Sequence, residues 1–113
     1  MIRALYTAAT GMNAQEINVA TISNNIANVN STGYKKSRAE FQDLLYQNLR
    51  LVGTLSPNGN QIPTGSQLGL GAKLGSVAKI YTQGDMIRTQ NQLDAAITGK
   101  GFFQIALPDG TIA

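Results

Sequence analysis

The fold is decided by the opening stretch MIRALYTAATGMNAQEINVATISNNIANVNST, residues 1–32. Apolar residues recur along it in two series with a spacing of seven, offset by three positions, and Gln15 is a polar interruption. Such an a/d pattern predicts an α-helix with a narrow apolar seam of the coiled-coil type. The seam consists of Leu5, Met12, Val19, Ile22, Ile26 and Val29. A helix of about 30 residues is about 45 Å long, so we expect the seam to pack against other helices and not against a core of its own.

Asparagine crowds the same stretch. It is a poor helix former, because its amide competes for backbone hydrogen bonds. An isolated helix of this composition should be marginal in water, which again indicates that partners order it. We expect the amides of Asn24, Asn25 and Asn28 to form hydrogen bonds between helices or between chains. Gly33 is expected to end the helix and to permit the bend that follows it, so the predicted helical segment covers residues 1–33.

The composition excludes several kinds of protein. The chain has 113 residues, a net charge of +3, only 13% charged residues, and neither cysteine nor histidine. Disulfide bonds, zinc sites and nucleophilic catalysis by Cys or His are therefore excluded. Asp85 and Asp94 could form a hydrolase carboxylate pair, but their positions in or beside turns explain them better. We predict no catalytic residue, no cofactor and no metal site.

The rest of the chain divides by composition into two parts. Residues 34–76 begin with a basic cluster and an amphipathic segment, for which helical and extended forms both remain open. They continue as a Gly- and Pro-rich run, which predicts an extended arm ordered by neighbouring molecules. Residues 77–113 contain alternating segments and turn signals, which predict the beginning of a mainly antiparallel β domain. The expected fold class is therefore α+β.

Within the last part, strands are expected at residues 77–81, 94–98 and 102–107. Phe102 and Phe103 should then lie on opposite faces of a strand, because successive side chains alternate. The following Pro-Asp-Gly, residues 108–110, predicts a turn, since proline fixes φ and glycine permits positive φ.

Two segments could suggest phosphate binding. The glycines of residues 69–76 have the wrong spacing for a nucleotide-binding loop, and an extended arm explains them better. The basic cluster at residues 35–38 carries too few cations for a convincing nucleic-acid surface, and ion pairs with Glu40 and Asp43 are favoured. No stretch approaches the roughly 20 apolar residues that cross a bilayer, and no secretory signal is evident. We predict neither a nucleic-acid partner nor membrane insertion.

Three stretches, in the correct order, give the chain a family resemblance. The first is the opening at residues 1–12, and the second is Ser23–Lys35, which carries Asn24, Asn25, Ala27, Asn28, Gly33, Tyr34 and Lys35. The third is the motif with Gly99, Gly101, Phe102 and Phe103. Together they resemble the bacterial flagellar rod and hook proteins. Residues 38–47, and an additional segment from about Tyr46 to Pro63, are most similar to the family members that form the distal rod, where such an insertion is thought to stiffen the rod.

The resemblance implies a structural protein and not an enzyme. In this family the N-terminal helix pairs with a C-terminal helix of the same chain, these pairs line a tubular axial polymer, and the β domain lies outside. The distal rod transmits torque across the periplasm from the motor to the hook. Its implied partners are further copies of itself, proximal rod and hook proteins, the peptidoglycan and outer-membrane rings, and the flagellar type III export apparatus, which needs no cleaved signal peptide.

Two alternatives remain open at this point. The chain could be another rod or hook member, or, less favoured, a basic binding module of a different class. No segment matches the C-terminal helix of the family, so the chain is expected to be the N-terminal part of a longer protein.

Overall fold

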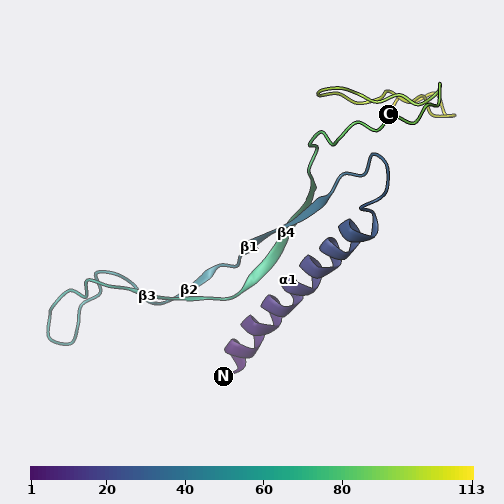
Figure 1. The fold of residues 1–113 in the computed structure, drawn as a ribbon. Helices are drawn as coiled ribbons and strands as arrows, with labels where there is room; N and C mark the ends of the chain where they lie inside the picture. Colours follow the sequence, from purple (N-terminus) through teal and green to yellow (C-terminus); the bar gives the residue numbers. More distant parts are fainter. The chain divides into compact units, whose positions relative to one another are not determined.

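The computed structural model describes residues 1–113 and divides into two units, Met1–Ile80 and Tyr81–Ala113. The first unit contains one long helix and four strands, and it confirms an extended α+β architecture (Figure 1). Its elements are α1 (Ile2–Ala27), β1 (Ser37–Asp43), β2 (Tyr46–Arg50), β3 (Ser66–Gly69) and β4 (Ala72–Lys79).

Helix α1 forms where the seven-residue pattern predicts it but ends at Ala27, earlier than the expected boundary at residue 33. The Asn28 amide still bonds the Asn24 carbonyl oxygen at 3.2 Å, but the Val29 amide bonds the Ile26 carbonyl oxygen, three residues back, so the helical ladder stops there. The Asn28 side chain also bonds the Asn24 carbonyl oxygen, at 3.0 Å, as asparagine commonly does at a helix end. Tight turns follow, and Gly33 adopts φ +73°. The bend assigned to Gly33 is therefore confirmed, although the helix has already ended.

The strands form a long two-stranded antiparallel ribbon. In the inner ribbon β1 pairs with β4, from Ser37 opposite Lys79 to Asp43 opposite Ala72. In the outer ribbon, residues 46–69, β2 pairs with β3, and the connection between them closes in a tight turn at Gly59. Both ladders contain a register shift, as expected for a twisted, exposed ribbon.

One expectation about residues 34–76 needs correction. The helical alternative for the amphipathic segment is wrong, because that segment forms β1 and β2. Much of the Gly- and Pro-rich run is the returning half of the ribbon, so it has a partner within the chain, and an arm ordered by neighbouring molecules stays a prediction. Its backbone groups bond across the ribbon, which satisfies donors and acceptors that would otherwise need water or a neighbour.

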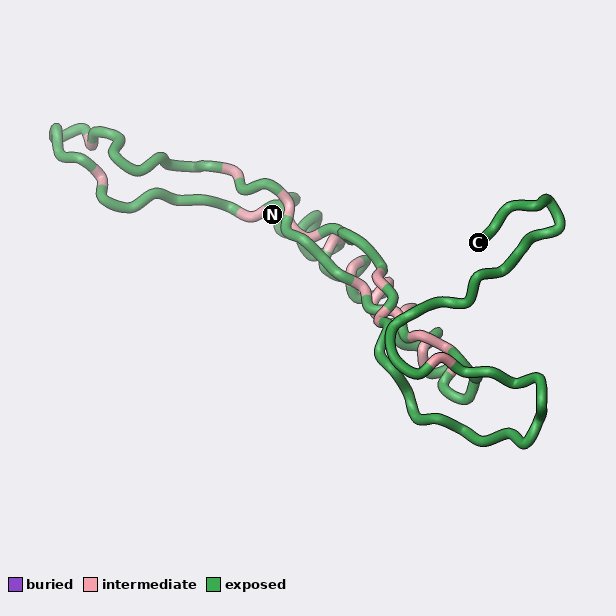
Figure 2. Tube along the Cα trace, turned by 90° about the horizontal axis from the view of Figure 1, so that it is seen from above, coloured by how far each residue is buried: buried purple, intermediate pink, exposed green.

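No side chain in the structure is buried. Helix α1 lies against the inner ribbon, and the residues between them are only half-buried, as the pink positions in Figure 2 show. The first unit therefore has a contact layer in place of a hydrophobic core. Such a small enclosed area is unusual for a chain with 42% hydrophobic residues.

The second unit contains turns and irregular segments without a regular strand. The strands expected at residues 94–98 and 102–107 do not form, because neither segment has a neighbour paired along its length. A short hairpin is present instead: Ile105 and Ala113 exchange two backbone hydrogen bonds of 2.9 Å, and Gly110 turns with φ +79°. The predicted Pro-Asp-Gly turn is thus confirmed.

A candidate assembly surface on helix α1

The side chains of all six seam residues are exposed to solvent. Their side chains are between 48% and 73% exposed, with Ile22 the least and Val29 the most open. Five of them follow one side of α1, Val29 lies in the turn just after it, and no element of the first unit covers them. Because burial of such a side chain stabilises by about 1.5–3 kcal/mol, the seam offers a substantial apolar surface to a partner.

A second stripe on α1 faces the ribbon. It is half-buried and repeats at intervals of three or four residues; its members are Thr10, Ala14, Ile17, Thr21 and Asn25, with Asn18 beside them and Asn28 at the C-cap of the helix. At 3.6 residues per turn this stripe lies on the side of the helix opposite the seam. Apart from Ile17, small and polar residues therefore face the ribbon, while the large apolar residues of the seam remain on the outside.

Asn25 makes the most extensive of the contacts between α1 and the ribbon. Its Nδ2 donates to the Ser37 carbonyl oxygen at 2.8 Å, and its Oδ1 accepts from the Ser37 amide at 2.9 Å. The Tyr34 hydroxyl also donates to Asn25 Oδ1, at 2.9 Å. The side-chain amide thus bonds the first residue of β1 as a neighbouring strand would, and fixes the start of the ribbon on the helix.

The other two asparagines organise the turn after α1. Asn28 Nδ2 donates to Asn24 Oδ1 at 2.9 Å, and the Ser31 hydroxyl donates to Asn28 Oδ1 at 3.4 Å. The Tyr34 hydroxyl lies 3.3 Å from Asn24 Oδ1. In the single chain these amides therefore bond within the molecule, and their hydrogen bonds to other helices or chains stay a prediction.

The helix and the turn coincide with a known sequence family. Residues 5–35 match the family described as "Flagella basal body rod protein". The whole chain is 50% identical over 113 residues to the flagellar basal-body rod protein FlgG of Buchnera aphidicola subsp. Schizaphis graminum, covering 44% of that protein. It is 54% identical over 113 residues to FlgG of Agrobacterium fabrum, with 97% of this chain and 42% of that protein covered.

The chain belongs to the flagellar rod and hook protein family. It spans less than half the length of these rod relatives. This flagellar chain is also 43% identical over 110 residues to the flagellar hook protein FlgE of Helicobacter pylori. That alignment covers 96% of this chain and 15% of the hook protein. The rod relatives are thus more similar to it than this hook protein is.

The third stretch of the family resemblance, which carries Gly99, Gly101, Phe102 and Phe103, lies in the second unit. Gly99 adopts φ +103° and donates its amide to Gln83 Oε1 at 2.9 Å, while Gln83 Nε2 donates to the Ile97 carbonyl oxygen at 3.0 Å. The Phe102 ring meets the Tyr81 ring edge-on, with centroids 5.5 Å apart. Neither phenylalanine lies in a strand and both are exposed, so the expected placement of the two rings on opposite faces of a regular strand is wrong. Gln83 organises this motif, and its position in the sequence gave no signal of that.

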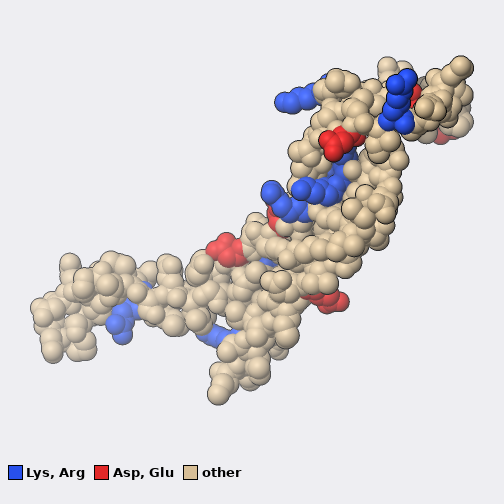
Figure 3. Space-filling model, in the orientation of Figure 1, with Lys and Arg blue, Asp and Glu red and all other residues tan.

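The charged groups of this family member are few and lie at the surface. Figure 3 shows a mostly uncharged face. Of the ion pairs expected for the basic cluster, the one between Arg38 and Glu40 forms, at 2.6 Å, whereas Asp43 forms none. A hydrogen bond with Asp43, and the negative charge of that group, raise the pKa of the Tyr46 hydroxyl. No cluster of acidic residues is arranged to hold a metal ion, and no helix is long and apolar enough to cross a membrane.

Proposed function

We propose that this protein is a structural subunit of the bacterial flagellar basal body that polymerises into the distal rod. The observation that carries the proposal is the exposed seam on α1, in a chain that is 50–54% identical to rod proteins over almost its whole length. A subunit that makes head-to-tail contacts without closing forms a helical filament, which suits a shaft that transmits torque. The hook protein alternative is less well supported, because the identity to the hook relative is 43%.

The seam would act through packing with other helices. Its six side chains have about half to three-quarters of their area left to bury, so each would contribute about 1–2 kcal/mol. The sum is about 6–12 kcal/mol, whereas association costs roughly 4–15 kcal/mol in lost freedom. A single seam contact would therefore be weak, and a stable filament requires each subunit to contact several neighbours. Coiled-coil packing of the seam is part of this proposal.

The remaining parts of the proposal follow from the rod assignment. The protein would be exported by the flagellar type III apparatus without a cleaved signal peptide and would join proximal rod to hook across the periplasm. The peptidoglycan and outer-membrane rings would surround it. The outer ribbon covers most of the segment that resembles the distal-rod insertion, and we propose that it lies outside the helical core of the filament.

Electron microscopy of basal bodies from cells that lack the encoding gene tests the assignment. We expect basal bodies that end at the proximal rod, carry no hook and regain both distal rod and hook when the gene is restored. Basal bodies with a complete rod but no hook would contradict the distal rod and indicate a hook subunit. Complete hooks without the gene would contradict any axial role.

A further inference from the structure

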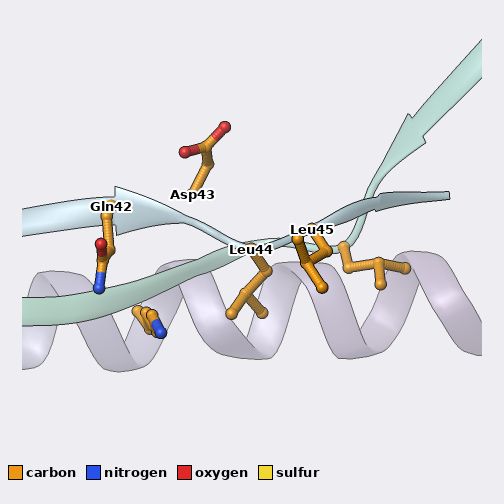
Figure 4. Close-up of a pocket in the computed structure, with 6 residues that line it drawn as sticks. Gln42, Asp43, Leu44 and Leu45 are labelled. Atoms are coloured by element: carbon orange, nitrogen blue, oxygen red, sulfur yellow. The ribbon is translucent and has the colours of Figure 1, made fainter.

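The ribbon has a joint where its inner and outer halves meet. One side of the ribbon is interrupted between β1 and β2, at Leu44 and Leu45, and the opposite side is interrupted between β3 and β4, at Leu70 and Gly71. Figure 4 shows Leu44 and Leu45 at this break, with α1 alongside. A single backbone hydrogen bond of 2.9 Å, from the Leu44 amide to the Gly71 carbonyl oxygen, crosses the joint. The direction of the outer ribbon is therefore weakly determined by the ladder itself.

Helix α1 touches the joint through Thr10. Gly71 adopts φ +125°, and a Cβ at this position would lie closer than 3.0 Å to Thr10 Oγ1. The Ala72 amide points to the same oxygen at 3.4 Å, and Thr10 Oγ1 donates to the Thr7 carbonyl oxygen at 2.7 Å. A threonine in a helix has few rotamers, and this one is already engaged by the helix backbone, so it has little freedom to move aside.

Two further contacts join α1 to the ribbon, one on each side of the joint. On one side Arg3 Nη1 donates to Gln47 Oε1 on β2, and on the other Asn25 bonds to Ser37 at the start of β1. From residue 3 to residue 25 the helix extends about 33 Å at 1.5 Å per residue. Thr10 therefore meets the ribbon between a contact to its outer half and a contact to its inner half.

We propose that Thr10 and Gly71 are positioning residues that lock the joint onto α1 and thereby set the direction in which the outer ribbon leaves the helix. The close approach at Gly71 excludes any side chain, so the ribbon backbone rests directly on the helix. This inference concerns the single chain and goes beyond the proposed function. Its consequence for a filament, in which the helix that carries the seam would orient the outer ribbon, rests on that function.

The alternative is that Gly71 is needed only for its positive φ. The chain provides a matched control, because Gly53 has φ +86° and nothing lies within 4 Å of the position that its Cβ would occupy. Gly53→Ala therefore imposes backbone strain without a collision, whereas Gly71→Ala imposes both. Thr10→Ala removes the contact between the Thr10 hydroxyl and the ribbon backbone without straining the backbone at Gly71. It therefore tests the proposal even if Gly71→Ala separates the strands of the ribbon.

The test uses pairs of spin labels, and the natural lack of cysteine makes labelling specific. Labels on Asn13→Cys in α1 and Ser66→Cys in β3 report the distance between helix and outer ribbon in the purified, unpolymerised protein. We expect one narrow distance distribution in the parent and in Gly53→Ala, and a shifted or clearly broadened distribution in Thr10→Ala and Gly71→Ala. The double variant should be less perturbed than the two single effects added together, because Thr10→Ala removes the oxygen with which the new Cβ of Gly71→Ala collides.

Parent-like distributions in both Thr10→Ala and Gly71→Ala would overturn the proposal. Equal broadening in Gly53→Ala would also overturn it, because strain alone would then explain the result. The readout is made before assembly, so its outcome is independent of whether the protein forms a rod.

Discussion

A charge placed in the middle of the seam gives the clearest separation between folding and assembly. Val19 lies near the centre of α1, where helix-dipole effects are small, and its side chain is 60% exposed. Burial of the exposed part against a partner helix would contribute about 1 kcal/mol. The Val19→Asp substitution loses this contribution. It also places an unpaired carboxylate in the interface, and burying that charge costs several kcal/mol more. A total loss of at least about 3 kcal/mol weakens each contact more than about 100-fold.

The same substitution should leave the single chain almost unchanged. An exposed position away from special backbone geometry typically alters the free energy of unfolding by less than about 0.5 kcal/mol. Circular dichroism of the purified variant should therefore match the parent, while cells that carry Val19→Asp should build no distal rod by electron microscopy and should not swim. Ala9→Asp is the control, because Ala9 lies outside both stripes on the side of the helix that carries Glu16. Swimming Val19→Asp cells with complete hooks would refute the seam.

Three further predictions concern the single chain. Asn25→Ala removes both hydrogen bonds to Ser37 and should destabilise the helix–ribbon contact by about 1–3 kcal/mol, seen as faster amide hydrogen exchange at Ser37; unchanged exchange would contradict it. Gly33→Val forces a β-branched residue to φ +73° and should lower the free energy of unfolding by about 1–3 kcal/mol in urea titration, and a neutral result would remove the need for glycine at the bend. Asp43→Asn removes the charge that disfavours the Tyr46 phenolate, so the pKa of Tyr46 should fall in an ultraviolet titration; a pKa that stays in place would exclude Asp43 as the cause.

Helix α1 was predictable because its signal is local. The seven-residue spacing from Leu5 to Ile26 fixes both the helix and its apolar side. The end at Ala27 has no clear sequence signal, because an asparagine such as Asn28 can lie within a helix or at its end, and the change from i−4 to i−3 bonding at Val29 is visible only in the folded chain. The ribbon-facing stripe was readable in principle, because Thr10, Ala14 and Thr21 repeat at helical spacing, but small and polar residues give a weak signal.

The ribbon and its joint could not be predicted in the same way. Each strand pair joins segments separated by a Gly- and Pro-rich run, and short segments with weak alternation do not specify a partner or a register. The contact between Thr10 and Gly71 links residues 61 positions apart, so no local pattern reports it. The hydrogen bond from the Gly99 amide to Gln83 likewise joins residues far apart in the sequence, so no local pattern predicts it.

The central claim is that the seam is open in the single chain and buried in the filament. Cysteine accessibility tests this directly, because the chain has no natural cysteine. Val19→Cys should react rapidly with a maleimide in the monomer and should be strongly protected in assembled rods isolated from swimming cells. Equal reactivity in monomer and rod would contradict the account.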